Sequence, residues 1–540
     1  MNNDYSFSDT AASLVIGWAM SARAPTSATS ADSATFVFHE AGYGDFGLTL
    51  ADGQSSSYET WAAMATISNS TTSSNSTCSS SATNVTATVS NSTYDYIIAG
   101  AGPAGIIVAQ RLAETGKSVL LIERGGASTA ATGGKSVVSW NSSVTQYDVP
   151  SMSYYLTTAS DTSEYCSQTA DMAGCLLGGG TMVNALMFVR PQEADFDDKW
   201  PTGWKWTDVS AAADRLYARN PGTTLASKDA QRYDQSVYNT LSSFFDGFGY
   251  SHIDAIESPN SKTMAYSYPP WDIQDGLRAG PVKSYLPLAN ALSNFKLTLN
   301  TQVIRVVRSG STMTGVEVES SDGSRQIINL NAGGSVVLAA GTLYTPALLY
   351  NTGIGPTDQI TTVQNGCVSV NLPDQADWIY LPVGQNLKDH PIFTLNFNTT
   401  NATSSMVAAN FTSPSLTNID LFAQQSGPLV QSGQRFNFWT SANTTNGTRY
   451  FQGTCSSTAK DTLRIKLYLT HGATSQGSLG ITAQGATSYI TKPWLTTTAD
   501  QTAIAEMIDS LLSAARNSSI ITPSDSSGGL PGRKQHVHAR

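Results

Sequence analysis

Residues 93–126 read TYDYIIAGAGPAGIIVAQRLAETGKSVLLIERGG, and this stretch decides how the chain is expected to fold. Its first apolar run, 94–99, has the length and composition of a buried strand, and residues 106–114 carry the apolar spacing of a helix. A second apolar run, 118–122, follows and ends in Glu123. Between the first strand and the helix lie three glycines in G-x-G-x-x-G spacing, Gly100, Gly102 and Gly105. The order strand, glycine turn, helix and strand predicts an α/β unit.

The glycines and the acid have distinct expected roles at a dinucleotide site. Gly100 permits a tight turn, Gly102 lets the backbone approach a pyrophosphate, and Gly105 lets helix and strand pack closely. The helix N-terminus offers free N–H groups and a positive dipole end to phosphates. Glu123 is placed to accept hydrogen bonds from ribose hydroxyls, and we include its neighbour Arg124 among the predicted cofactor residues. The alternative is a structural glycine turn in an unrelated α/β unit.

The composition describes a large soluble protein with few charges. The chain has 540 residues, which is long enough for more than one domain and a large buried core. Hydrophobic residues make up 40% of the chain and charged residues only 13%. The net charge of −10 would repel phosphate backbones and anionic lipid, so we expect neither nucleic acid nor a membrane as a partner.

The abundance of Ser, Thr and Asn suits a secreted glycoprotein, and we expect an extracellular location. The first residues, MNNDYSFSDT, lack the basic and apolar segments of a signal peptide, which suggests that the true start is missing. The cysteines show no metal-ligand spacing, but Cys166 and Cys175 are near enough to close a small loop, and we predict a disulfide between them. Asn-x-Ser/Thr acceptors occur at Asn69, Asn75, Asn84, Asn91, Asn141, Asn398, Asn401, Asn410, Asn443, Asn446 and Asn517.

The N-terminal residues 1–66 contain short apolar segments that predict strands, at 12–20, 34–39 and 46–50. So few strands would expose too much apolar surface for a domain, and we interpret them as the end of a β-sandwich. Residues 67–92 are almost wholly Ser, Thr, Asn, Ala and Val, a composition that cannot bury enough apolar area to order itself. We therefore predict a flexible linker there.

Three further stretches carry a family resemblance. Residues 174–191 read GCLLGGGTMVNALMFVRP, in which successive glycines bring backbone N–H groups against a flat ligand and Asn184 adds donors and an acceptor. Residues 336–355 read VVLAAGTLYTPALLYNTGIG, and residues 382–391 read PVGQNLKDHP. Together they resemble the signatures of the glucose-methanol-choline (GMC) oxidoreductases, which wrap FAD. Thr352 stands where this family usually has Ser.

The resemblance implies FAD rather than NAD as the cofactor, because nicotinamide dehydrogenases lack the second and third stretches. It implies a structural role for His390. It also extends the predicted cofactor-binding residues to Gly179, Gly180, Thr181, Asn184, Val303, Gly341 and Thr342.

Within the GMC family the chain resembles the cellobiose dehydrogenases, over about residues 94–522. The residues that carry this are GLRAGPVKSYL at 276–286, LYLTHG at 467–472 and the two predicted disulfide cysteines. The N-terminal segments IGWAMSARAP and FHEAGYGDFGLTLADG resemble the end of that family's haem cytochrome domain. His39 matches a haem-ligating histidine, but the methionine ligand has no counterpart, so we expect no haem.

The fold class that follows is α/β (α+β), with a Rossmann-like FAD-binding domain of the GMC type and an antiparallel-sheet substrate domain. The FAD-binding domain is predicted at 93–205 and 297–390, and the substrate domain at 206–296 and 391–522. Residues 1–66 are then the remnant of a cytochrome-type β-sandwich. We expect an unstructured, divergent tail at the C-terminal end, residues 523–540.

The resemblance also implies an activity, the oxidation of a CH–OH group in which a sugar's anomeric hydroxyl becomes a lactone. The expected partners are a sugar or other alcohol and an external electron acceptor. Arg278 could donate to sugar hydroxyls, or it could form a surface or interdomain salt bridge.

One departure leaves the catalytic residue unknown. In the family a histidine near the C-terminus takes the hydroxyl proton, and neither its motif nor that of its partner is present in this chain. His471, His536 and His538 are candidate substitutes, although none matches the family position. The alternative hypothesis is therefore a non-catalytic flavin-binding remnant, or an incomplete gene product.

Overall fold

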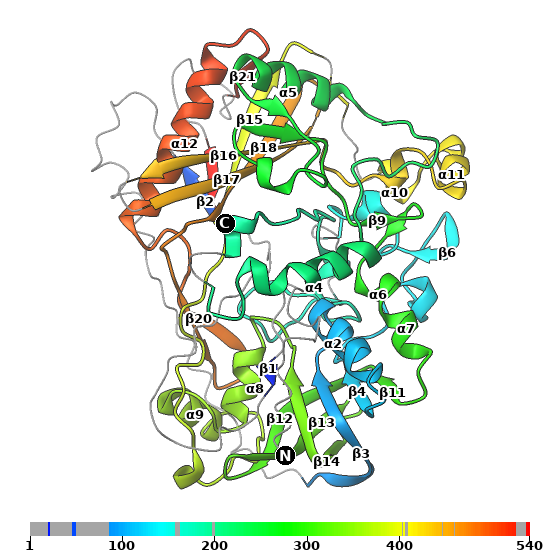
Figure 1. The fold of residues 1–540 in the computed structure, drawn as a ribbon, viewed down its shortest axis with the longest axis vertical. Coiled ribbons are helices and arrows are strands. Elements are labelled where there is room, and N and C mark those ends of the chain that lie inside the picture. The colour runs from blue at the N-terminus through cyan, green and yellow to red at the C-terminus, as the bar shows by residue number, and fades with distance from the viewer. Residues whose placement is uncertain are drawn as a thin grey trace.

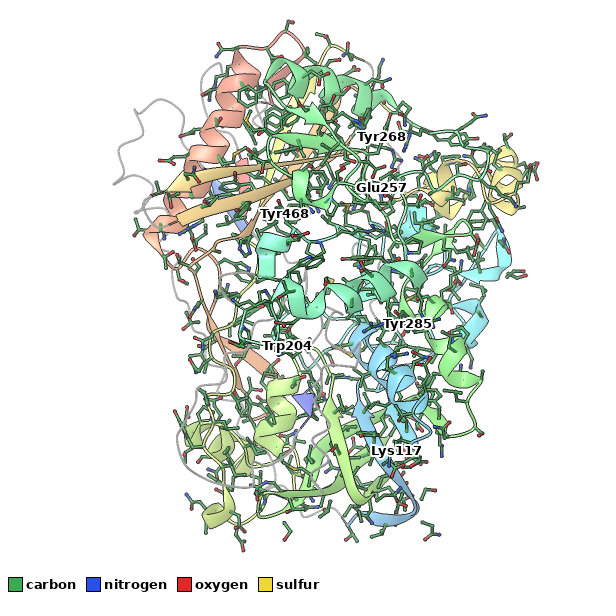
Figure 2. All side chains as sticks on the ribbon, in the orientation of Figure 1. Lys117, Trp204, Glu257, Tyr268, Tyr285 and Tyr468 are labelled. Atoms are coloured by element: carbon green, nitrogen blue, oxygen red, sulfur yellow. A yellow bond between two sulfur atoms is a disulfide. The ribbon has the colours of Figure 1, made fainter. Side chains whose placement is uncertain are left out.

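The computed structural model describes residues 20–21, 46–49, 86–156, 163–196, 200–401, 403–404, 409–444, 447–457, 459–524 and 536–539. In this part of the chain two large sheets lie one above the other along the long axis of the molecule (Figure 1). Figure 2 marks the two halves by Lys117, near the lower sheet, and Tyr268, near the upper sheet. His39 lies outside the described residues.

The lower sheet is the predicted nucleotide-binding sheet. Its strands run in the order β11-β4-β3-β14-β13-β12, with β1 paired to β14. The pairs β11–β4, β4–β3 and β3–β14 are parallel, whereas β12, β13 and β14 form an antiparallel meander. The strands are β1 (Met20–Ser21), β3 (Thr88–Ala99), β4 (Val119–Ile122), β11 (Phe295–Thr298), β12 (Thr301–Ser309), β13 (Thr312–Ser320) and β14 (Arg325–Leu338).

The first α/β unit forms as predicted because its strands are apolar on both faces. All four residues of β4 and the last three of β3 are buried, as expected for parallel strands covered on both sides. Helix α2 (Pro103–Ala113) begins after Gly102, with proline at its first position, where the missing N–H has no helical partner to lose. The parallel pairing of Ala99 with Ile122 brings the ends of both strands to one edge of the sheet.

The upper sheet is mainly antiparallel and carries the second core. Its strands run in the order β2-β22-β15-β18-β17-β16-β8-β7, with β21 paired to β15. Buried and half-buried residues alternate along β18, and the buried ones, such as Leu467 and Leu469, pack against Ile508 and Leu511 of the longest described helix, α12. The strands are β2 (Phe46–Thr49), β7 (Ser251–His252), β8 (Ala265–Ser267), β15 (Ile392–Thr399), β16 (Phe436–Thr444), β17 (Gly447–Ser456), β18 (Thr462–His471), β21 (Ile521–Pro523) and β22 (His536–Ala539).

The remaining strands form three short hairpins, and helices cover the sheets and the space between them (Figure 1). The hairpins pair β5 (Val137–Val138) with β6 (Asn141–Thr145), β9 (Ile273–Gln274) with β10 (Leu277–Arg278), and β19 (Ser478–Ile481) with β20 (Thr487–Thr491). The other helices are α3 (Gly180–Val183), α4 (Trp206–Arg219), α5 (Ser236–Gly247), α6 (Pro281–Ser284), α7 (Leu286–Asn290), α8 (Thr345–Asn351), α9 (Thr357–Gln364), α10 (Ala409–Thr412), α11 (Leu416–Ala423) and α12 (Thr498–Arg516).

Three predicted boundaries differ from the structure. The hairpin β19–β20, assigned to the substrate domain, packs on the nucleotide-binding side, where Ile481 joins the core of the lower sheet and Tyr350 Oη donates to the Leu479 carbonyl at 3.0 Å. Strand β3 begins at Thr88, inside the predicted linker, because β14 extends far enough to pair with it. The tail expected to be unstructured contributes β22, since the edge of β15 has backbone groups free to pair with it.

Candidate cofactor site

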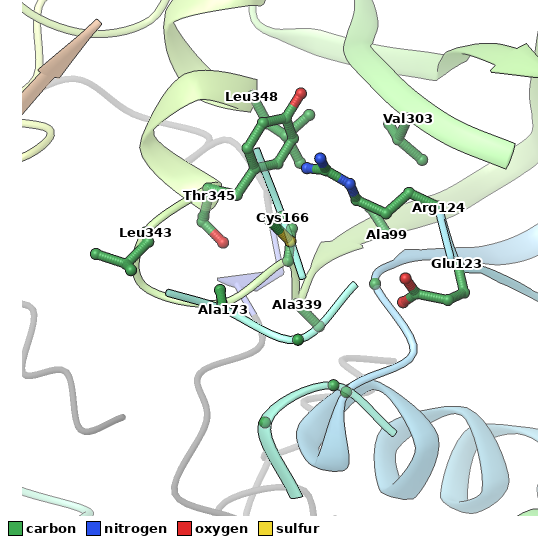
Figure 3. A pocket seen from close by; sticks show the side chains of 18 of the residues that line it. Ala99, Glu123, Arg124, Cys166, Ala173, Val303, Ala339, Leu343, Thr345 and Leu348 are labelled. Atoms are coloured by element: carbon green, nitrogen blue, oxygen red, sulfur yellow. The ribbon is translucent and has the colours of Figure 1, made fainter. Parts of the chain in front are cut away.

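A cavity that opens to solvent lies where β3 and β4 end. Most of the predicted cofactor residues line it: Gly100, Gly102, Glu123, Arg124, Gly179, Gly180, Val303, Gly341 and Thr342. They come from segments far apart in the sequence, which the lower sheet brings to one edge. Figure 3 shows the side chains of Glu123, Arg124 and Val303 around this space. Gly105, Thr181 and Asn184 are not part of its lining.

The three glycines of the turn fall into two groups, according to what a Cβ atom would meet at each position. Gly100 has a φ of +103°, and a Cβ there would meet the Ala339 carbonyl oxygen at 2.4 Å. A Cβ on Gly105 would lie 1.9 Å from the Gly100 carbonyl oxygen. A Cβ on Gly102, in contrast, would meet no atom within 4 Å. The protein itself therefore does not exclude a side chain at Gly102, which faces the cavity, and the space is available to a ligand.

The second glycine stretch packs directly against this turn. The Gly178 N–H donates to the Ala101 carbonyl at 2.8 Å. A Cβ on Gly179 would lie 3.2 Å from the Gly102 Cα, and its φ of +53° also favours glycine. The N-terminus of α2 and the glycine run thus form two adjacent backbone walls, which suits a pyrophosphate.

Glu123 lies beside the turn, as its sequence position predicts. Its carboxylate accepts hydrogen bonds from the N–H groups of Ala101 and Gly125, each at 2.9 Å. The side chain is buried, and this burial raises the pKa of the carboxyl although the two backbone hydrogen bonds oppose the shift. A carboxylate has about four lone-pair directions, so Glu123 keeps room to accept from a hydroxyl group in the cavity.

Arg124 has a buried polar atom without a partner among the described residues. Its Nη1 has no hydrogen-bond acceptor in the part of the chain that the structure describes, and the guanidinium lies 4.8 Å from the centre of the Tyr344 ring. Leaving a buried charged donor without an acceptor is costly, so an acceptor on a ligand would stabilise it. Arg124 therefore fits a ligand that carries acceptor groups, as FAD does in its phosphates and adenine ring.

Sequence reasoning missed several residues of this site. Gln302 and Tyr344 line the cavity, and the Gln302 amide donates to the Tyr344 hydroxyl. Cys166 and Thr169 also line it. Gln302 could have been found from its position next to Val303 in the chain, but no glycine or acid motif marks the other three.

Thr181 and Asn184 are joined by hydrogen bonds to the buried side chain of Arg278. Arg278 Nη1 donates to the Thr181 carbonyl at 2.9 Å and to Asn184 Oδ1 at 2.8 Å, and Nη2 donates to the Asn184 carbonyl at 3.0 Å. Its Nε donates to the Tyr147 carbonyl at 3.0 Å, and the residue is 3% exposed. Burial lowers the pKa of Arg278 to about 10. Arg278 thus contacts protein acceptors, and its binding of a sugar stays a prediction.

The disulfide prediction is confirmed, since Cys166 and Cys175 are bonded with a Cα–Cα distance of 5.1 Å. Neither His390, which was predicted to be structural, nor His471, the candidate base with a described side chain, is among the residues that line the cavity. His471 Nδ1 instead lies 3.9 Å from an Asp195 carboxylate oxygen. The strand β22 includes His536 and His538, whose side chains lie outside the described part.

Comparison with known proteins identifies the family. The family model described as GMC oxidoreductase matches residues 94–392, more than half of the chain, so the chain belongs to the GMC oxidoreductases. A second model, described as the cytochrome domain of cellobiose dehydrogenase, matches residues 2–60.

Curated relatives and solved structures agree with this assignment. Glucose dehydrogenase [FAD, quinone] of Drosophila melanogaster is 28% identical over 334 residues, which cover 56% of this chain and 49% of the relative. Oxygen-dependent choline dehydrogenase of Vibrio vulnificus is 28% identical over 337 residues, covering 55% and 52%. The chain thus spans about half the length of these relatives. A structure of formate oxidase has the same fold, with a TM-score of 0.61 at 17% identity, covering 82% of this chain and 85% of that one.

The family and the cavity together assign FAD as the cofactor. A structure concerned with FAD modification in the formate oxidase of Aspergillus oryzae RIB40 matches with a TM-score of 0.61 at 17% identity, and it covers 82% of this chain and 85% of that one. The open space at Gly102 and the unpartnered Arg124 Nη1 fit such a ligand. Within the described ranges, no helix is long and apolar enough to span a membrane.

Proposed function

We propose that this protein is an FAD-dependent dehydrogenase that oxidises a sugar at its anomeric CH–OH group, giving a lactone. FAD, when bound, supplies the hydride acceptor. The main support is the cofactor cavity, where the glycine turn, Glu123 and Arg124 come together. These residues lie inside the region that matches the GMC family. The match of residues 2–60 to the cytochrome domain of cellobiose dehydrogenase supports a sugar such as cellobiose as the substrate.

The chain's own residues would bind and orient the cofactor. The N–H groups at the start of α2 and the backbone of Gly179 and Gly180 face the expected pyrophosphate, and Glu123 faces the ribose. Arg278 holds Asn184 in place by two hydrogen bonds. The residue that takes the hydroxyl proton is unassigned. An external acceptor would reoxidise the flavin.

We also propose secretion as the route of this protein. Six of the glycosylation acceptors are exposed in the structure, where a glycan could be attached: Asn91, Asn398, Asn401, Asn410, Asn443 and Asn517. The Cys166–Cys175 disulfide suits an oxidising compartment.

Anaerobic mixing of the FAD-loaded chain with cellobiose, glucose or choline tests the substrate class. Loss of the oxidised flavin absorbance with a sugar, together with a lactone product, supports the proposal. Loss of the flavin absorbance with choline, and with neither sugar, would indicate that the substrate is a non-sugar alcohol. Tight FAD binding with no bleaching by any of the three would favour a non-catalytic flavin-binding protein.

A further inference from the structure

Residues 164–175 form a hairpin that is closed by the Cys166–Cys175 disulfide. The Cys166 N–H donates to the Ala173 carbonyl at 2.8 Å, and the Cys175 N–H donates to the Glu164 carbonyl at 2.7 Å. Tyr165 and Gly174 form an antiparallel bridge between these bonds. The two arms of the hairpin are therefore joined by the disulfide and by these two backbone hydrogen bonds.

This hairpin is part of the wall of the cofactor cavity. Cys166, Thr169, Ala173 and Gly174 all line the cavity. Figure 3 shows the Cys166 side chain within the pocket, near Ala173 and Ala339. A ligand that fills the cavity would therefore lie against the disulfide.

The two arms of the hairpin are anchored unequally. The Cys175 arm packs closely on the nucleotide-binding unit, because a Cβ on Gly125 would lie 1.9 Å from the Cys175 carbonyl oxygen. The Leu177 N–H also donates to the Gly126 carbonyl at 2.9 Å. The tip is bonded to Thr487, which accepts from the Ala170 N–H and donates its own N–H to the Gln168 carbonyl, each at 3.0 Å. The Cys166 arm is linked to the Cys175 arm by the disulfide and by the two backbone hydrogen bonds given above.

We infer that the Cys166–Cys175 disulfide is a thiol–disulfide exchange site that is coupled to FAD binding. A dithiol reductant breaks the S–S bond: it gives two electrons and two protons, Cys166 and Cys175 become thiols, and the reductant becomes a disulfide. The Cys166 arm then loses its covalent link to the Cys175 arm, and the wall against FAD loosens. The bonded form binds FAD tightly and the reduced form binds it weakly.

The coupling must work in both directions. If reduction weakens FAD binding by a given factor, then FAD shifts the dithiol–disulfide equilibrium toward the disulfide by the same factor. Couplings of this kind are typically about 5–150-fold, and we expect about tenfold or more here. A tenfold factor corresponds to a shift of about 30 mV in the midpoint of this two-electron couple.

The test measures both effects on the 540-residue protein. FAD affinity is measured by flavin fluorescence in oxidised and reduced dithiothreitol buffers. The redox midpoint of Cys166 and Cys175 is measured by alkylation and peptide mass spectrometry, with and without saturating FAD. We expect the dissociation constant to rise about tenfold on reduction and the midpoint to become more reducing with FAD. An unchanged dissociation constant after verified reduction, or equal midpoints, would overturn the inference.

A double variant separates this disulfide from any other thiol chemistry in the chain. Cys166→Ser with Cys175→Ser should show the weakened FAD affinity at once and no further response to dithiothreitol, while Cys455→Ser, which removes a buried free thiol, should respond as the wild type does. A dithiothreitol response that persists in the double variant contradicts the inference. It rests on the cofactor cavity and not on the proposed sugar, so a failure to oxidise sugars leaves it intact. Absence of FAD binding by the oxidised wild type overturns both.

Discussion

Arg124 and Arg278 both lie against the segments that build the cofactor site, but their surroundings differ. All three guanidinium nitrogens of Arg278 donate to protein oxygens, at distances of 2.8–3.0 Å. Arg124 lies on the cavity wall, and its buried Nη1 has no acceptor among the residues that the structure describes. Buried polar groups are normally hydrogen-bonded. The protein itself supplies the acceptors for Arg278, whereas Arg124 needs an acceptor from a ligand.

The glycines repeat this contrast. Protein backbone fills the position of a Cβ at Gly105, whereas the same position at Gly102 is open. Residues of the first kind should affect stability when changed, and residues of the second kind should affect FAD binding.

The largest expected effect is on stability at Arg278. Arg278→Ala leaves the carbonyls of Tyr147, Thr181 and Asn184 without this donor and should lower the free energy of unfolding by about 3–5 kcal/mol. Arg124→Ala should lower it by much less in FAD-free protein, because the change removes a buried donor that lacks an acceptor among the described residues. Urea denaturation of both variants measures the difference. Equal losses in the two variants would contradict the comparison.

Substitutions at Gly105 and Gly102 should differ in unfolding free energy in the same assay, by less than the two arginine variants differ. Gly105→Ala forces its new methyl group against the Gly100 carbonyl and should cost about 1–3 kcal/mol of unfolding free energy. Gly102→Ala is the matched control, because its methyl group enters open space. FAD-free Gly102→Ala should therefore stay within about 1 kcal/mol of the wild type. A Gly102→Ala loss as large as that of Gly105→Ala would show that the space is not open.

Arg124 should matter for affinity. A hydrogen bond to a charged group contributes about 1.5–3 kcal/mol, so Arg124→Ala should weaken FAD binding about 10–150-fold. Arg124→Lys keeps the charge and loses the planar guanidinium, and an intermediate affinity is expected. Isothermal titration with FAD measures both variants. FAD affinity in Arg124→Ala that equals the wild-type value would mean that Nη1 does not face the cofactor.

The smallest effect concerns the pH dependence of stability near Arg278. Burial raises the pKa of Asp272 to about 6, while the hydrogen bond from Asn220 and the charge of Arg278 oppose the shift. The folded protein then binds this proton more tightly than the unfolded chain, so the contribution to stability is present below about pH 4 and is lost as the pH rises to about 6. Asp272→Asn should remove this dependence, which is at most about 1.4 kcal/mol per pH unit. Urea denaturation of wild type and variant across this range checks it, and a constant difference between them would refute it.

The sequence was sufficient for the parts of the site that follow from local backbone geometry. The turn from Gly100 to Gly105 and the position of Glu123 could be predicted because strand, turn and helix are contiguous in the chain. The same holds for the disulfide, whose cysteines lie nine residues apart. The resemblance supplied Gly179, Val303 and Gly341, which come from distant segments.

The rest depended on tertiary contacts that no local pattern encodes. Tyr344 and Cys166 reach the cavity only because the lower sheet and the 164–175 hairpin meet there. The full burial of Arg278 follows from its packing against Tyr147 and Asn184, which lie about a hundred residues earlier in the chain. The placement of β19–β20 on the lower sheet likewise depends on the contact between Tyr350 and Leu479.

The most direct test of the account is a titration of FAD into three FAD-free proteins: the wild type, Gly102→Val and Gly247→Val. Gly247 is a matched control, because it is exposed at the end of α5 and a Cβ there also meets no atom within 4 Å. The account predicts saturable one-to-one binding with quenched flavin fluorescence for the wild type and Gly247→Val, and affinity at least about a hundredfold weaker for Gly102→Val, whose side chain fills the pyrophosphate position. Wild-type affinity in a folded Gly102→Val variant would contradict the assignment of this cavity to FAD.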